Sequence, residues 1–532
     1  MKICTIDEMR AIEEKAVAVL GLSTDTLMEN AAHAICDVIR YHLPLAPSSL
    51  VAFVCGPGSN GTLGLISARQ LHAYRRAVKV ISITQATECS DNRRHHFEIA
   101  ARCGVPCVTI NSSNNLAHEL PTSGAIVDAL LGPTPDVTPL IADTIDTINK
   151  LNALNKTELL VVSIDTPSGV CGNTGSIPSV AIDAHATVAL GLPKRGNVVP
   201  PGVSRGGKLF VSSMSLPPHL LDCMDRRDAL VELVQPDPLP HRLTHGHKGT
   251  FGDIVFIAGA GTYYGAPVFA ALASLRAGAG YARLACPASM TPALATIAPE
   301  VVFVPQRETD AGSLCLDNIQ SLVSLANHGD FVVIGPGIST HDETQLLARD
   351  ILAHISRPVL IDGDGLTAVV GHTDLIQQRQ APTILTPHVG EMARLLGVSV
   401  GHVARDPIES AKHAAISMGC YVVLKGYRSV VANPDGYASI NTSGNDGMGT
   451  AGSGDVLSGT IAAMVGLGLP PERAARTGVF IHGLAGDLAM RAVGPDGMTA
   501  RDILEHLSAA VWTYRTSRAE LLVGFHGACT SV

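Results

Sequence analysis

The chain has 532 residues, a length that suggests about two to four domains. Its net charge of −9 and the lack of a long basic run give no electrostatic basis for binding nucleic acid. Glycine (52) and proline (32) are frequent and aromatic residues make up only 4%, which indicates short turns and small-residue packing, as in α/β proteins.

The amino terminus predicts an amphipathic helix and not a targeting segment. The apolar residues that share one face of this helix are Ile6, Met9, Ile12 and Ala16. The longest uncharged apolar stretch, residues 456–469, is too short and too rich in glycine to span a bilayer. The 12 cysteines are scattered, which fits free thiols in a reducing compartment. We therefore expect a cytoplasmic protein that does not enter a membrane.

Apolar runs that end in polar loops predict parallel strands in both halves of the chain. In the first half they are residues 50–56, 78–84, 124–132 and 159–169. In the second half they are residues 253–261, 331–337, 357–365, 382–391 and 421–426. Ligands of open α/β sheets bind at the carboxyl ends of the strands, so each half is expected to carry a functional edge.

The first strand is followed by a glycine-rich loop of the Gly-x-Gly-x-x-Gly type. Its glycines are Gly56, Gly58 and Gly61, and Glu88 follows the next strand roughly where a ribose-binding acid stands in a dinucleotide fold. Taken alone, this pattern predicts an NAD-dependent dehydrogenase. That alternative lacks a recognisable catalytic His, Lys or Tyr motif.

The first half also resembles the NAD(P)H-hydrate epimerase domains, over about residues 1–220. The motifs that carry the resemblance are LMENAA (27–32), GPGSNG (56–61), IVDALLG (126–132), IDTPSG (164–169) and LPKRGNVVPPG (192–202). The resemblance implies a potassium ion held by Asn60, Asp128 and Ser168, an all-oxygen set suited to a hard cation. It also implies contacts of Ser59, Asn60, Gly61 and Asp165 with the substrate.

Two loops depart from the epimerase pattern. Thr62 and Leu63 replace a Gly-Asp pair, so a carboxylate is missing and we expect Thr62 to add bulk where backbone approaches a phosphate. Pro133 and Pro135 remove N–H donors from the loop after Asp128. Two interpretations remain open: a slow epimerase, or a domain kept for stability, oligomerisation or ligand binding.

Closely spaced prolines in residues 234–246 predict a stiff connector between the halves. The predicted organisation is a first domain, a linker, a second domain and a tail, at residues 1–225, 226–245, 246–515 and 516–532.

The second half contains a glycine turn that opens an apolar helix at Gly452, Ser453 and Gly454, followed at once by Asp455. Backbone N–H groups at such a turn, with the helix dipole behind them, stabilise a phosphate or a developing negative charge. A carboxylate beside an anion site suggests a general base that deprotonates a hydroxyl attacking a nucleotide's terminal phosphoryl group. The alternative is that Asp455 only caps the helix.

Other loops of the second half offer further candidates. His388 and Glu391 enter a helix three residues apart, where capping by Glu391 or substrate hydrogen bonding is expected over metal ligation, because no third ligand is apparent. Lys425 ends a strand and offers an ammonium to a phosphate. The glycines at 259–265 only partly match a dinucleotide fingerprint.

Together these motifs resemble the ribokinase-like fold, and within it the ADP/ATP-dependent NAD(P)H-hydrate dehydratases, over about residues 245–510. The resemblance implies that the hydrated nicotinamide nucleotide contacts Ala266, Gly337, His388 and Asp455. It implies that ATP or ADP, with Mg²⁺, contacts Lys425, Gly426, Tyr427, Arg428, Ser429 and Gly454.

The predicted fold is therefore α/β with two domains, an N-terminal Rossmann-like and a C-terminal ribokinase-like three-layer sandwich. The predicted function is repair of the hydrates NADHX and NADPHX, with Asp455 as base and Gly452, Ser453 and Gly454 as the anion hole. Two rivals remain, a small-molecule kinase that keeps its phosphorylated product and a nucleotide-binding scaffold without turnover. The resemblance also implies a homo-oligomer.

Overall fold

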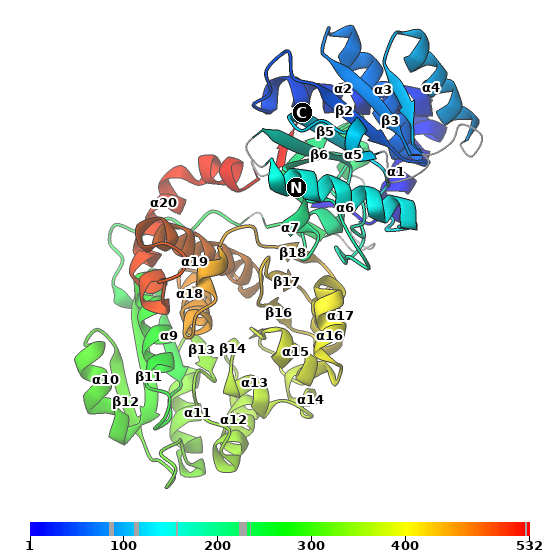
Figure 1. Cartoon of the computed structure of the whole chain (residues 1–532). Coiled ribbons are helices and arrows are strands. Elements are labelled where there is room, and N and C mark those ends of the chain that lie inside the picture. The colour runs from blue at the N-terminus through cyan, green and yellow to red at the C-terminus, as the bar shows by residue number, and fades with distance from the viewer. Residues whose placement is uncertain are drawn as a thin grey trace. The chain divides into compact units, whose positions relative to one another are not determined.

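The computed structural model describes residues 1–83, 90–110, 116–155, 158–222, 231–234, 236–526 and 529–531 (Figure 1). The chain forms two compact units, one built from Lys2–Asp228 with His526–Val532 and the other from Ala229–Phe525 with Met1. The prediction of two α/β domains is confirmed. The predicted domain limits remain predictions, and residues 226–230 and 235 of the predicted linker lie outside the described residues.

The N-terminal unit contains an eight-stranded sheet in which every pair of neighbouring strands is parallel. Its order is β19-β8-β7-β6-β5-β2-β3-β4. The strands are β2 (Val51–Cys55), β3 (Val78–Ser82), β4 (Cys107–Thr109), β5 (Gly124–Ala129), β6 (Leu159–Ile164), β7 (Ala186–Leu190), β8 (Lys208–Ser212) and β19 (Cys529–Ser531). The chain adds strands outward from β2 to β4 and then returns to the other side of β2 with β5. The gap between the ends of β2 and β5 is thus a switch point, where ligands of such sheets bind.

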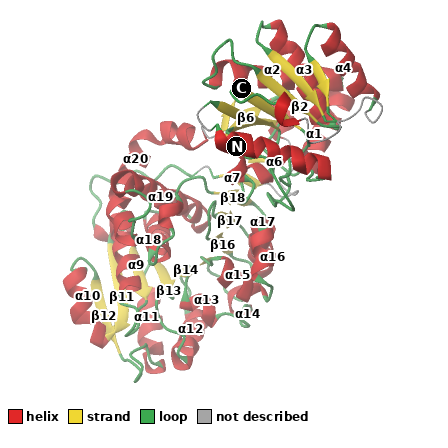
Figure 2. Cartoon of the chain, in the orientation of Figure 1, coloured by secondary structure: helices red, strands yellow, loops and turns green. Residues whose placement is uncertain are grey.

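Helices cover both faces of this sheet, because its strands bury alternate residues on opposite sides (Figures 1 and 2). Val51, Phe53 and Cys55 of β2 pack with the first group of helices, and Ala52 and Val54 with the second. The first group is α1 (Ile6–Leu20), α2 (Thr24–Asp37), α3 (Ser59–Ala73) and α4 (Asp91–Arg102), and the second is α5 (Leu116–Glu119) and α6 (Pro139–Leu154). Shorter elements are β1 (Lys2–Ile3), α7 (Val203–Gly206) and α8 (Pro218–Asp222).

The predicted first helix is confirmed as α1. Thr5 and Glu8 form a capping box at its start, and Gly21 ends it in the left-handed conformation. Met9, Ile12 and Ala16 are buried, as the apolar spacing predicts.

The sheet of the C-terminal unit follows the order β9-β18-β17-β16-β15-β14-β13-β10-β11-β12. Its strands are parallel except where β17 pairs with β16 and β18. They are β9 (Val231–Leu233), β10 (Asp253–Ile257), β11 (Tyr281–Pro287), β12 (Val302–Gln306), β13 (Phe331–Ile334), β14 (Val359–Ile361), β15 (Thr383–Leu385), β16 (Tyr421–Leu424), β17 (Val430–Ala432) and β18 (Ala438–Ile440). The switch point of this sheet lies between β10 and β13.

Helices also cover both faces of the second sheet (Figure 2). One face packs against α9 (Gly265–Arg276), α10 (Thr291–Ile297), α18 (Ser453–Gly466), α19 (Pro471–Val493) and α20 (Ala500–His526). The remaining helices are α11 (Ile319–His328), α12 (Asp342–His354), α13 (Asp364–Ala368), α14 (Asp374–Gln377), α15 (Val389–Leu396), α16 (Val400–Arg405) and α17 (Pro407–Met418).

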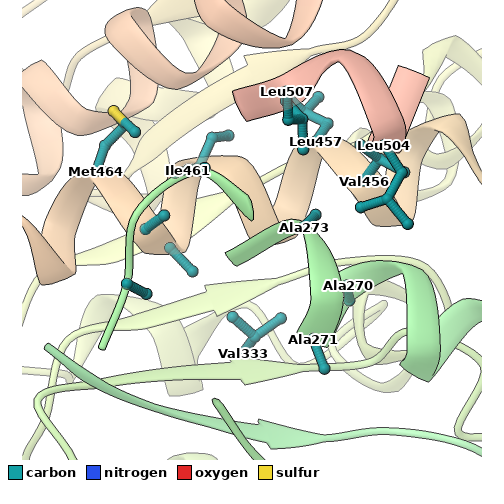
Figure 3. Packing of buried hydrophobic residues seen from close by; sticks show 14 of the residues in the cluster. Ala270, Ala271, Ala273, Val333, Val456, Leu457, Ile461, Met464, Leu504 and Leu507 are labelled. Atoms are coloured by element: carbon teal, nitrogen blue, oxygen red, sulfur yellow. The ribbon is translucent and has the colours of Figure 1, made fainter. Parts of the chain in front are cut away.

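Helix α18 lies inside the main core of this unit. Figure 3 shows Val456 and Leu457 of α18 beside Leu504 and Leu507 of α20. The backbones of α18 and α9 approach so closely that a Cβ on Gly459 would lie 2.1 Å from the Ala270 carbonyl oxygen. The start of α18, which carries the glycine turn, is therefore held by close packing.

All nine predicted strand runs contain a parallel strand. The runs 357–365 and 382–391 extend beyond their loops into the first residues of α13 and α15, and residue 84 of the run 78–84 lies outside the described residues. The antiparallel pairing of β17 was not predicted, and β17 and β18 lie outside the predicted runs, as do β4, β7, β8, β9, β11 and β12. Within the described parts of the chain, no helix has the length and apolarity needed to cross a membrane.

Candidate functional sites

Loops from neighbouring strands meet at the switch point of the C-terminal sheet. Gly337 follows β13 with a φ of +61°, and a Cβ there would lie 2.6 Å from Tyr263 Cβ and 3.2 Å from Ala266 Cβ. Ala266 belongs to α9, after β10. The two predicted substrate residues Ala266 and Gly337 are thus adjacent.

The loop after β13 also touches the loop after β14. A Cβ on Gly335, whose φ is +123°, would lie 1.8 Å from the Asp362 carbonyl oxygen. Only glycine permits this approach. Asp362 and Asp364 are consequently held beside the residues that the sequence singled out.

The glycine turn at the start of α18 has the geometry of an anion-binding turn. Gly452 has a φ of +90°, and a Cβ there would lie 2.9 Å from the ring of Phe269 and 3.0 Å from Ala500 Cβ. Ser453 and Gly454 form the first turn of a 14-residue helix, whose initial N–H groups have no intrahelical acceptor. The positive end of the helix dipole adds to their attraction for an anion.

Asp455 lies in the same first turn and is partly buried. The helix has no side-chain cap, and no hydrogen bond to the Asp455 carboxylate is found among the described residues, so the capping alternative has no support. Burial, the largest influence, and the nearby carboxylates of Asp362, Asp364 and Glu391 together raise its pKa to about 7 against the opposing charge of Lys425. A carboxylate with a pKa near neutrality is well matched to general-base catalysis.

Lys425 connects the carboxylate cluster with the glycine turn. Its Nζ donates to Asp362 Oδ1 at 2.8 Å and lies 3.8 Å from Glu391 Oε2. A Cβ on Gly454 would lie 3.3 Å from the same Nζ. Burial lowers the pKa of Lys425, but the charges of Asp362 and Glu391 outweigh it and the net shift is upward, so the side chain stays cationic.

A cavity of about 650 Å³ opens beside this turn. Among its lining residues are those predicted to contact the nucleotide and one predicted to contact the substrate: Lys425, Gly426, Tyr427, Arg428, Ser429, Gly454 and His388. Ser453 also lines it, whereas Ala266, Gly337 and Asp455 do not. The predicted residues therefore fall into two groups. One group lines the cavity, and the other, Ala266, Gly337 and Asp455, lies outside its lining.

His388 caps α15. Its Nδ1 accepts hydrogen bonds from Gly390 N at 3.0 Å and Glu391 N at 3.3 Å, and Glu391 Oε2 accepts from His388 N at 2.8 Å. The expected capping by Glu391 is confirmed. Among the described residues, no three His, Cys, Asp or Glu side chains are grouped as a metal site would require.

The sequence did not indicate His482, which lines the same cavity from α19. Its ring hydrogen-bonds the backbone of Ser453, and burial lowers its pKa to about 4, so it is neutral at physiological pH. Nor did it indicate Asp362, whose Oδ2 accepts from Ser458 Oγ at 2.7 Å. Both contacts join residues far apart in the sequence.

In the N-terminal unit, the glycine loop leads directly into α3. A Cβ on Gly56 would lie 1.8 Å from the Leu130 carbonyl oxygen, and one on Gly61 2.0 Å from the Gly56 carbonyl oxygen. The buried Arg93 donates from Nε to the Gly56 carbonyl at 2.7 Å and so fixes the loop. Glu88, the expected ribose-binding acid, lies outside the described residues.

The three predicted potassium ligands come together at this switch point. Ser168 Oγ donates to Asp128 Oδ1 at 2.6 Å, and Ser168 N donates to Asp128 Oδ2 at 2.9 Å. Asn60 Nδ2 donates to the carbonyls of Leu131 (2.8 Å) and Ile164 (2.9 Å), which leaves its Oδ1 as an acceptor. Burial raises the pKa of Asp128, while hydrogen bonds from Ser168 and Ser163 oppose the shift.

A cavity of about 950 Å³ adjoins this group. It is lined by the predicted substrate residues Ser59, Asn60 and Asp165, and also by Leu63 and Pro133. Gly61 does not line it and is instead packed against the Gly56 backbone.

The two departures from the epimerase pattern have different positions. Leu63 faces the cavity, as the missing carboxylate would. Thr62 is buried outside the cavity lining and its Oγ1 donates to the Gly58 carbonyl at 3.5 Å, so its expected bulk against a bound phosphate is not seen.

Lys194 also lines this cavity, and the sequence showed it only as part of a motif. Its Nζ donates to Asp165 Oδ1 at 2.6 Å, and both side chains are buried. Asp165 has a φ of +64°, a strained conformation for a residue other than glycine.

Two family models match the chain. Residues 254–509 match the model described as NAD(P)H-hydrate dehydratase, and residues 24–196 match the YjeF-related protein N-terminus. The crystal structure of the ADP/ATP-dependent NAD(P)H-hydrate dehydratase from Bacillus subtilis, co-crystallised with ATP and Mg²⁺, is 28% identical, with a TM-score of 0.47 over 52% of this chain and 95% of that one.

Curated relatives match almost the full length. A bifunctional NAD(P)H-hydrate repair enzyme of Thermofilum pendens is 40% identical over 97% of both chains. One of Moorella thermoacetica is 35% identical over 95% of this chain and 96% of its own. The chain therefore belongs to the family of bifunctional NAD(P)H-hydrate repair enzymes.

Proposed function

We propose that the C-terminal unit restores NADH and NADPH from their S-form hydrates at the expense of ATP or ADP, with Asp455 as the general base. The observation that carries this proposal is the position of Asp455 in the first turn of α18, next to Ser453 and Gly454, with a pKa raised by burial and by Asp362 to about 7. At neutral pH a large fraction of this carboxylate is ionised and still basic enough to accept a proton.

The reaction begins when Asp455 takes the proton of the hydroxyl on the hydrated ring. The hydroxyl oxygen attacks the terminal phosphorus of the nucleotide, and the bond from that phosphorus to the bridging oxygen breaks. The backbone N–H groups of residues 452–454 and the ammonium of Lys425 stabilise the charge on the transferred group. Phosphate then leaves with electrons supplied by the ring nitrogen, and a proton leaves the neighbouring carbon to restore the reduced ring.

Mg²⁺ on the nucleotide phosphates would neutralise their charge during this transfer. The chemistry of the site fits such a cation. Negative charge accumulates here, because Asp362, Asp364 and Glu391 each raise the pKa of the nearby Asp455. Lys425 provides an opposing positive charge. A cation carried in with the nucleotide would offset this negative charge.

One assay tests the proposal against its rivals. Purified full-length protein is mixed with S-form NADHX, Mg²⁺ and either ATP or ADP, and the absorbance of NADH is followed. Nucleotide-dependent NADH formation supports a dehydratase. A stable phosphate ester without NADH identifies a kinase, and binding without turnover identifies a scaffold.

Asp455→Asn provides the matched variant because it keeps the shape of the side chain and removes the base. We expect it to lower the rate roughly 10²–10⁴-fold while nucleotide affinity changes little. Retention of the wild-type rate would refute the assigned role.

For the N-terminal unit we propose interconversion of the R and S hydrates, with Ser59, Asn60, Gly61 and Asp165 at the substrate. A potassium ion would be held by Asn60 Oδ1, the Asp128 carboxylate and Ser168 Oγ, a set of oxygen atoms suited to a hard cation. The ion would compensate the buried charge of Asp128, whose pKa burial otherwise raises. Replacing K⁺ by choline should slow the interconversion of R- and S-form NADHX. In a separate thermal unfolding experiment, the same replacement should lower the melting temperature of this unit.

We also propose a cytoplasmic homo-oligomer. The cysteines with described side chains are all free, as expected in a reducing compartment. Light scattering of the purified protein measures its mass directly, and a monomeric mass would end the proposal of an oligomer.

A further inference from the structure

The cavity of the N-terminal unit carries ionisable groups whose roles in the reaction are not yet assigned. Asp165 stands directly after β6, and its carboxylate lines the cavity although the residue is only 5% exposed. Oδ1 accepts from Lys194 Nζ at 2.6 Å and from Leu190 N at 3.2 Å. No described residue donates to Oδ2. One oxygen is therefore fixed by the protein while the other remains available to a ligand in the cavity.

Lys194 holds this arrangement in place. Its Nζ also donates to the Leu190 carbonyl at 2.8 Å, so the ammonium is anchored to backbone as well as to Asp165. Burial lowers the pKa of Lys194, but Asp165 outweighs it and the net shift is upward, which keeps the lysine charged.

Glu13 faces the same cavity from α1. It is partly buried, whereas the two other acidic residues that line the cavity beside Asp165, Glu14 and Asp136, are exposed. The charged groups that act on Glu13 are Lys194, Asp165 and Arg10. Burial is the largest influence and raises the pKa of Glu13, with Asp165 adding to the shift and Lys194 and Arg10 opposing it.

Two of the acidic residues that line the cavity thus differ in their surroundings. Asp165 is held in an ion pair with Lys194, while Glu13 has no ion pair within 4 Å among the described residues and burial raises its pKa. Such a difference between neighbouring carboxyl groups is how proteins provide a base and an acid at the same pH.

We infer that Asp165 and Glu13 are the base and the acid of the epimerisation, and that Lys194 is the residue that positions Asp165. This inference rests on the proposed epimerase function and assigns the groups that move protons in it.

The substrate carbon carries a hydroxyl and the ring nitrogen, so its configuration inverts when the carbon–nitrogen bond opens and closes again. Asp165 takes the hydroxyl proton, the oxygen forms a carbonyl, and the electron pair of the broken bond goes to the ring nitrogen, which takes a proton from Glu13. Rotation about the adjacent carbon–carbon bond turns the carbonyl over. The reverse proton transfers close the ring with the opposite configuration and return both carboxyl groups to their initial states.

The test is the rate of R-to-S exchange of NADHX, followed by chromatography with the full-length protein, K⁺ and no nucleotide, so that dehydration does not run. Glu13→Gln should slow exchange roughly 10²–10⁴-fold. It should also remove the fall in rate at alkaline pH, because that fall reports ionisation of the acid. Glu98→Gln is the control, since it makes the same change at an exposed position outside the cavity and should leave the rate unchanged.

Lys194→Gln separates positioning from mere structural support. Without the ammonium, Asp165 Oδ1 loses the partner that holds it beside Leu190, so kcat for exchange should fall while KM changes little. Lys194→Arg restores a cation and should recover much of kcat. A loss of kcat that Lys194→Arg does not recover, or an equal change in KM, would reduce Lys194 to a structural role and overturn that part of the inference.

The outcomes of these experiments distinguish a failure of the acid–base assignment from a failure of the proposed epimerase function. Wild-type protein that does not accelerate exchange above the spontaneous rate refutes the epimerase proposal itself. Wild-type protein that accelerates exchange while folded Glu13→Gln retains the full rate refutes only the acid–base assignment.

Discussion

Lys425 Nζ lies 2.8 Å from Asp362 Oδ1, and this ion pair joins the end of β16 to the end of β14 beside the glycine turn of α18. Asp362 is only 2% exposed, and its second oxygen accepts from Ser458 Oγ. The pair thereby fixes one positive charge next to Gly454. A buried pair with both ends anchored is expected to position its ligand well but to tolerate the loss of either partner poorly.

Lys425→Met should weaken nucleotide binding and destabilise the C-terminal unit. The substitution keeps most of the aliphatic stem but leaves Asp362 buried without its cation, a change that costs about 3 kcal/mol in comparable sites. Urea denaturation measures the loss of stability and calorimetry measures the loss of affinity.

Lys412→Met is the matched control. Lys412 is also buried and paired, with Glu409 at 3.3 Å, but it lies on α17 outside the cavity lining. Nucleotide affinity should therefore be unchanged in this variant. Equal losses of affinity in both variants would mean that Lys425 acts only through stability.

Asp364→Asn should move the pH dependence of dehydration to lower pH. Burial and the charge of Asp362 raise the pKa of Asp455 to about 7, and Asp364 contributes in the same direction. A general base works when ionised, so the rate should rise with pH through about 7 in the wild type. Removing one neighbouring negative charge lowers this pKa, and the midpoint should fall by roughly 0.5–1 pH unit.

The asparagine can still accept the hydrogen bond that Ser339 N donates to Asp364 Oδ2 at 2.9 Å, so the loop should keep its conformation. Asp374→Asn, at an exposed position that starts α14, is the control and should leave the profile in place. A profile of Asp364→Asn that coincides with the wild type would contradict the electrostatic origin of the shift.

Gly452→Ala should disable the anion turn. The φ of +90° is unfavourable for alanine, and the added Cβ would lie 2.9 Å from the Phe269 ring. We expect a loss of about 2 kcal/mol in the free energy of unfolding and a large loss of dehydratase activity.

Gly401→Ala in α16 makes the same change where no atom lies within 4 Å of the added Cβ. It should stabilise the protein by about 0.5–1 kcal/mol, because alanine is the better helix former. Thermal unfolding checks the prediction: the free energy of unfolding should fall in Gly452→Ala and rise in Gly401→Ala.

The secondary structure and the helix caps could be predicted from the sequence, because they depend on residues that are close together in the chain. The apolar runs specify parallel strands, the spacing of Met9, Ile12 and Ala16 specifies the buried face of α1, and the His388–Glu391 spacing specifies a helix cap. Candidate residues at the strand ends come together because parallel strands end at one edge of a sheet.

The partners that tune these residues could not be predicted in the same way. The hydrogen bond between Lys425 and Asp362 joins residues 63 positions apart in the sequence. The bonds between Lys194 and Asp165 and between Arg93 and Gly56 join residues 29 and 37 positions apart. Nothing in the local sequence marks such pairs, because each depends on the order of strands in the sheet. The different positions of Thr62 and Leu63 could not be predicted either. Leu63 lines the cavity, whereas Thr62, its neighbour on α3, lies outside the lining and bonds the Gly58 carbonyl.

This difference between Thr62 and Leu63 gives the last prediction. Leu63→Asp alone should raise R-to-S exchange, about tenfold if the new carboxylate gains one charge-assisted hydrogen bond to the substrate, the equivalent of about 1.4 kcal/mol. Leu63 lines the cavity in the early part of α3, where the helix dipole favours an acidic side chain. Thr62→Gly should add nothing to the rate and should cost about 1 kcal/mol of stability, because it only weakens the helix. Leu63→Asn is the control with the same shape and no charge. An exchange rate in folded Leu63→Asp no higher than in Leu63→Asn would show that the missing carboxylate does not limit this unit.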